Sequence, residues 1–121
     1  MNNDNIELIE NAFENIENIN SSSPSDIIKA IDSTIEDIDT GNLRVAEKIN
    51  NNWVINQWVK KAILLYFRIN DMKLISGSSG DSHWWDKIDS KFQGWDEEKF
   101  VKSGFRAVPG SIVRKGSFVA K

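Results

Sequence analysis

The sequence predicts a mainly helical α+β domain with one β-hairpin. In two segments, apolar residues recur at steps of three and four, which is the spacing of one helix face, and in a third they cover more than one face of a helix. Between residues 43 and 55 the apolar period falls to two, as in a half-buried strand. A six-residue echo follows near the end of the chain.

The first helix is predicted from Asn3 or Asp4, either of which can cap it, to the polar stretch 18–22. A helical spacing of apolar residues supports it, namely Ile6, Ile9, Ala12, Phe13, Ile16 and Ile19. The glutamates between them form the solvated face of an amphipathic helix.

The second helix is predicted to begin at Ser23, with Pro24 in its first turn and Asp26 completing an arrangement like a capping box. Its apolar stripe is Ile28, Ile31, Ile35 and Ile38. Gly41 is expected to end it, because glycine readily adopts the left-handed conformation that follows a helix.

Residues 43–55 are predicted to form the hairpin, with its turn at residues 50–52, since asparagine tolerates positive φ. A central third helix is expected from a cap at Asn56 to Ile69. Ser76 to Gly80 is expected to be a flexible loop. A short fourth helix is predicted from a cap at Asp96 to Gly104, with acidic residues in its first turn and lysines later, as the helix dipole favours.

The tail repeats Gly110-Ser-Ile-Val as Gly116-Ser-Phe-Val at a spacing of six. Hexapeptide periodicity is typical of β-helices, whose strands are stable only as about three or more stacked repeats. Two copies also arise by chance, so the periodicity alone leaves accident and the start of a β-helix equally open.

Composition excludes several function classes. The chain has 121 residues, no cysteine and a net charge of −3, with 15 basic and 18 acidic side chains. We expect no thiolate metal site and no other metal site, no nucleic-acid partner and no disulfide. The N-terminus does not look like a signal peptide and no apolar run reaches 18 residues, so a cytoplasmic protein without a membrane partner is expected.

Three segments carry a resemblance to a known family: residues 41–54, residues 57–71, and Gly104-Phe-Arg-Ala-Val-Pro109. Together they resemble the N-terminal part of tetrahydrodipicolinate N-succinyltransferase, an enzyme of the diaminopimelate route to lysine. Residues 75–92 depart from the family pattern. The resemblance implies an N-terminal helical domain over residues 1–107 and the first coil of a left-handed hexapeptide β-helix over residues 108–121, the rest of which this chain does not contain.

The resemblance also implies an activity, the transfer of succinyl from succinyl-CoA to the acceptor by a cytoplasmic homotrimer. The catalytic groups and the coenzyme site would lie on the absent β-helix, so this chain would hold no catalytic residue, bind no cofactor and be inactive alone. Arg106 matches the arginine that binds the dicarboxylate acceptor. A guanidinium suits that role, because its planar fork pairs with a carboxylate through two hydrogen bonds.

Other candidates have simpler explanations. His83 is the only histidine and is expected to lie on the surface. Trp84, Trp85 and Trp95 suit a stacking platform, but such residues more often pack in a core or an interface. The pair at Lys60 is expected to be a solvated helix edge. The alternative to the enzyme is an interaction module without catalytic activity that binds a partner through its tryptophans or its tail strand.

Overall fold

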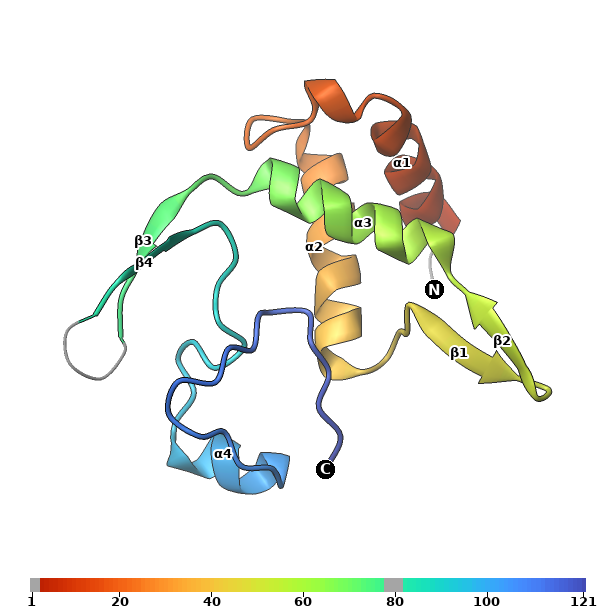
Figure 1. Cartoon of the computed structure of the whole chain (residues 1–121). Helices are drawn as coiled ribbons and strands as arrows, with labels where there is room; N and C mark the ends of the chain where they lie inside the picture. Colours follow the sequence, from red (N-terminus) through yellow and green to blue (C-terminus); the bar gives the residue numbers. More distant parts are fainter. Residues whose placement is uncertain (1–2, 78–81) are drawn as a thin grey trace.

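Three packed helices form the centre of the molecule. The computed structural model describes residues 3–77 and 82–121. Helices α1 (Asn3–Glu14), α2 (Ser25–Thr40) and α3 (Gln57–Ile69) each pack against the other two (Figure 1). A short 3₁₀ helix, η1 (Ile16–Asn18), follows α1. The three helices predicted from apolar spacing are therefore confirmed.

The core lies where the apolar stripes of these helices meet. Its largest fully buried side chains are Ile9, Ile31, Ile35, Val59 and Leu65. Burying an aliphatic side chain of this size stabilises a fold by about 1.5–3 kcal/mol relative to leaving it exposed. The core is thus built from the positions that the helical period selects.

The helix ends agree with the sequence only in part. Gly41 ends α2 in the left-handed conformation, with φ +83°. However, Pro24 occupies the cap position of α2, and the Ser23 hydroxyl accepts a hydrogen bond from the Asn20 amide instead. The predicted capping box is therefore wrong. Asn56 is at the cap position of α3, but its side chain donates to the carbonyl of Arg44 rather than capping the helix.

The predicted hairpin is confirmed and is shorter than expected. Strands β1 (Ala46–Ile49) and β2 (Asn52–Ile55) pair antiparallel, and only two residues separate them. Asn50 and Asn51 have φ values of +48° and +64°, as a two-residue type I′ turn requires. The hairpin projects from the helices in Figure 1.

The prediction of a single hairpin is wrong. A second antiparallel pair, β3 (Lys73–Ile75) with β4 (Trp84–Asp86), follows α3. Three residues a strand are too few for an alternating pattern to be recognised in a sequence. Residues 78–80 of the predicted Ser/Gly loop lie outside the described residues.

The last part of the chain contains α4 (Glu97–Ser103) and an irregular tail. The Asp96 carboxylate caps α4 by accepting from the Lys99 amide at 2.9 Å, and Gly104 ends the helix with φ +75°, both as predicted. The described part of the tail contains no strand, and its one bridge pairs Ser90 with Arg114. The first β-helix coil therefore stays a prediction.

Candidate functional site

Arg106 lies three residues beyond the end of α4, on the exposed segment that leads into the tail. Among residues 3–77 and 82–121, its guanidinium makes no hydrogen bond or ion pair. A guanidinium that has no protein partner is open to an anionic ligand, and a carboxylate fits its planar fork.

A cluster of four aromatic rings supports the segment that carries Arg106. The cluster consists of Phe92, Trp95, Phe100 and Phe105, and its ring contacts have centroids 5.0–6.1 Å apart. Contacts at these separations favour edge-to-face and tilted rings, as observed. Because Phe105 directly precedes Arg106, the cluster fixes the backbone next to the guanidinium.

The residues that precede and follow the aromatic cluster and Arg106 are held side by side. The Lys91 amide donates to the Val113 carbonyl at 2.9 Å, and the Lys115 amide donates to the Asp89 carbonyl at 2.9 Å. Residues 92–112, which we call the α4 lobe, therefore form a closed loop with two paired stems. The stems are residues 89–91 and 113–116.

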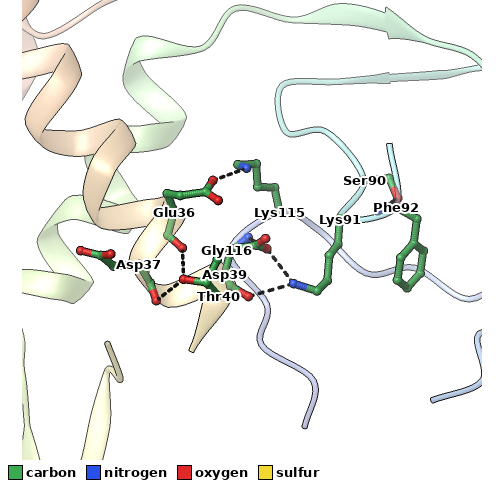
Figure 2. A network of polar contacts seen from close by, with 9 residues as sticks. All are labelled: Glu36, Asp37, Asp39, Thr40, Ser90, Lys91, Phe92, Lys115 and Gly116. Atoms are coloured by element: carbon green, nitrogen blue, oxygen red, sulfur yellow. Dashed lines mark hydrogen bonds and ion pairs between the residues drawn. The ribbon is translucent and has the colours of Figure 1, made fainter. Parts of the chain in front are cut away.

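Both stems meet the last turn of α2 in a polar network (Figure 2). The Lys91 ammonium donates to the Asp39 backbone carbonyl at 2.9 Å and lies 3.0 Å from Asp39 Oδ1. The Gly116 amide donates to the same carboxylate oxygen at 2.7 Å. The Lys115 ammonium donates to Glu36 Oε2 at 2.7 Å, and this hydrogen bond is the main reason that the pKa of Lys115 is raised.

Two mainly apolar hollows lie beneath the tail. The larger, of about 230 Å³, lies between α2, α3 and residues 114–117, and the smaller, of about 180 Å³, is bounded by α2, Arg44 and Phe118. The Arg44 guanidinium stacks 4.0 Å from the Phe118 ring centroid. Arg114 pairs with Asp86 at 2.6 Å. These arginines thus already have partners, whereas Arg106 has none among the described residues.

The remaining predicted candidates are dispersed. His83 is exposed, as expected, and its Nδ1 lies 2.9 Å from the Ser76 hydroxyl. Trp84 and Trp85 are largely exposed on β4, whereas Trp95 packs in the aromatic cluster. The three tryptophans therefore do not form one platform.

The two lysines at the start of α3 lie in different environments. Lys60 is exposed, as predicted, whereas Lys61 forms an ion pair with Glu10 of α1.

In the described ranges, no group of three or more acidic or histidine side chains could hold a metal ion. No described helix is long and apolar enough to cross a membrane.

The network around Asp39 was not predicted from the sequence. One local signal pointed to it: the last turn of α2 carries Asp37 and Asp39 but no basic residue. Acidic groups at a helix C-terminus oppose the helix dipole, so such a turn needs cations from elsewhere in the fold.

Comparisons with known proteins identify the family. The family model described as tetrahydrodipicolinate N-succinyltransferase N-terminal matches residues 5–69. The chain is 47% identical over 115 residues to a 2,3,4,5-tetrahydropyridine-2,6-dicarboxylate N-succinyltransferase of Agrobacterium fabrum (strain C58), which covers 94% of this chain and 40% of that protein. Proteins of the same name from Rhizobium rhizogenes (strain K84) and Methylobacterium sp. (strain 4-46) are 48% and 49% identical, over 93% of this chain and 40% of theirs.

These matches first define a class: the chain is similar to the N-terminal segments of N-succinyltransferases. It belongs, more particularly, to the tetrahydrodipicolinate N-succinyltransferase N-terminal family. The chain spans about 40% of the length of these curated relatives. Arg106 and the tail lie beyond the residues that the family model matches.

Proposed function

We propose that this chain is the N-terminal domain of a succinyltransferase of the diaminopimelate route to lysine, and that the remaining part supplies the catalytic groups. The support is the family match over residues 5–69 together with about 47% identity to transferases over almost the whole chain. In this proposal residues 1–107 are the domain proper and residues 108–121 begin a β-helix that forms a homotrimer.

The proposed reaction is an acyl transfer from succinyl-CoA to the amine of the opened tetrahydrodipicolinate. The amine nitrogen attacks the thioester carbonyl, a C–N bond forms, the C–S bond breaks, and the coenzyme leaves as its thiol. A general base takes the proton from the amine, and hydrogen-bond donors stabilise the oxyanion. We assign none of these groups to this chain, which is expected to be inactive alone and to bind no cofactor.

Arg106 is the residue of this chain that we assign to the acceptor. Its guanidinium is exposed and has no partner among the described residues, on a segment fixed by the aromatic cluster. A dicarboxylate needs cationic partners, and a charged hydrogen bond contributes about 1.5–3 kcal/mol.

A chimeric transferase tests both parts of the proposal. The segment of the Agrobacterium fabrum relative that this chain matches is replaced by this chain, and coenzyme A release is measured. We expect activity from the chimera and none from the 121-residue chain alone. A soluble, trimeric but inactive chimera would contradict the assignment of this chain as the N-terminal domain of such an enzyme.

Arg106→Ala in the active chimera is expected to weaken acceptor binding roughly ten- to a hundredfold, with the KM for succinyl-CoA unchanged. Arg106→Lys should recover part of the loss, because lysine keeps the charge without the planar fork. Lys102→Ala is the matched control, since Lys102 is an exposed cation of the same lobe that pairs with Glu98. Unchanged acceptor kinetics in Arg106→Ala would refute the assignment of Arg106.

One observation bears on the alternative, an interaction module. Leu74 and Trp85 face each other across β3 and β4, and both are more than 60% exposed. Two results together would favour this alternative. The chimera would be inactive, and a protein that binds the wild-type chain would no longer bind Trp85→Ala.

A further inference from the structure

The α4 lobe is packed separately from the main core. Helices α1, α2 and α3 pack against one another, whereas α4 makes no comparable contact with any of them and buries no residue completely. The lobe has its own aromatic cluster, which includes Phe92 and Phe105. Its placement on the helices therefore depends on what fastens its two stems.

One carboxylate holds both stems. Asp39 Oδ1 lies 3.0 Å from the Lys91 ammonium, on the first stem, and accepts the Gly116 amide at 2.7 Å, on the second. Figure 2 shows the side chains of Lys91 and Asp39 converging from the first stem and from α2. Among the described residues, Asp39 is the only residue of α2 whose side chain is bonded to both stems.

Burial distinguishes this contact from its neighbour. The side chains of Lys91 and Asp39 are 7% and 15% exposed, whereas those of Lys115 and Glu36 are 36% and 57% exposed. Breaking a buried ion pair leaves a charge without compensation, but an exposed pair is screened by water and contributes about 0–1 kcal/mol. Asp39 is therefore the stronger of the two fastenings.

We propose that Asp39 is a positioning residue, which fixes the α4 lobe on α2 and thereby holds Arg106 where the acceptor binds. The second half of this statement rests on the proposed function. The first half concerns the chain alone and is tested without any ligand.

Hydrogen exchange on the 121-residue chain tests the fastening. In Asp39→Asn, we expect the hydrogen-bonded amides of Lys91, Lys115 and Gly116 to exchange at least tenfold faster, with α1 and α3 unchanged. Asp37→Asn is the matched control, because it makes the same charge change in the same turn at an exposed residue with no side-chain contact to either stem. Lys91→Gln, which keeps a donor, is a milder second variant if Asp39→Asn fails to fold.

Exchange at the stems that stays at the wild-type rate in Asp39→Asn and Lys91→Gln would overturn the fastening. Equal acceleration in Asp37→Asn would also overturn it, since the effect would then be one of helix charge alone.

Kinetics of the chimera test the connection to Arg106. Asp39→Asn is expected to raise the acceptor KM roughly tenfold and to leave the KM for succinyl-CoA unchanged. In an Arg106→Ala background the same change should have no further effect on the acceptor KM, because Asp39 acts through Arg106. Additive effects would overturn the positioning role.

The two proposals fail in different ways. If Arg106→Ala leaves acceptor binding normal while Asp39→Asn loosens the stems, the role of Arg106 is refuted and the fastening stands. If Arg106→Ala weakens binding while Asp39→Asn changes neither exchange nor acceptor KM, the fastening is refuted and the role of Arg106 stands.

Discussion

Replacing Gly41 by alanine is expected to dislodge the tail from the end of α2. Gly41 has φ +83°, and a Cβ built on it would lie 2.6, 2.7 and 2.9 Å from three atoms of the Phe118 ring. Non-bonded carbons prefer separations of about 3.5–4.0 Å. The ring must therefore move, and with it the tail residue that stacks under Arg44.

The expected loss of stability in Gly41→Ala has two parts, one from the backbone conformation and one from the contact with Phe118. An alanine in the left-handed region costs about 1–2 kcal/mol at any site. Gly110 has φ +88°, and a Cβ added to it would meet nothing within 4 Å, so Gly110→Ala carries the backbone part alone. Displacing Phe118 also weakens its contact with Arg44, which contributes about 0.5–1 kcal/mol at an exposed site. We expect Gly41→Ala to cost about 0.5–1 kcal/mol more than Gly110→Ala.

Urea unfolding followed by tryptophan fluorescence measures the difference. With a slope of about 1–3 kcal/mol per molar urea, the midpoints of the two variants should differ by roughly 0.2–1 M. In a Phe118→Ala background the difference should vanish, because the contact has been removed. Equal midpoints in the wild-type background, or a difference that survives Phe118→Ala, would refute the contact between Gly41 and the tail.

Two further predictions concern the helical core. Ile35→Ala should lower the free energy of unfolding by about 2–5 kcal/mol, whereas Ile112→Ala, at an 84% exposed position, should change it little; equal urea midpoints would contradict this. Burial first, and then the charge of Asp32, raise the pKa of Tyr66, the only tyrosine. The stability that comes from keeping this phenol neutral is present below its unfolded pKa, about 10, and is lost as pH rises toward the folded pKa. Absorbance near 295 nm should therefore show a higher titration midpoint in the native chain than in urea, and identical midpoints would contradict the shift.

The elements that the sequence predicts correctly are those whose signals are local. The stripe through Ile31 and Ile35 repeats with the helical period, so it identifies a buried face without knowledge of any partner. The asparagines of the turn and Gly41 indicate positions of positive φ, which few residue types adopt. Asp96 needs only the amide three residues ahead to cap α4.

The errors occur where two local signals compete or where an element is too short. Ser23 and Asp26 have the right spacing for a capping box, but the structure uses Ser23 in the preceding turn and starts α2 one residue later. The pairing of β3 with β4 depends on contacts across a loop, which a three-residue pattern cannot indicate. The assignment of Arg106 rests on a family resemblance, because its exposure beside the aromatic cluster follows only from the folded lobe.

The end of α2 shows how a local conflict can indicate a non-local contact. Taken alone, Glu36 and Asp39 destabilise the helix, because negative charge lies at the negative end of the dipole. The fold offsets this with Lys91 and Lys115, which are at least 52 residues away in sequence. A helix terminus whose charges oppose its dipole is therefore a place to look for a docked segment, since natural sequences remove local conflicts that no tertiary contact resolves. By this reasoning the acidic residues at the end of α2 are retained because they bind the two stems. The charge of Asp39 then stabilises the fold only while the α4 lobe is docked on α2.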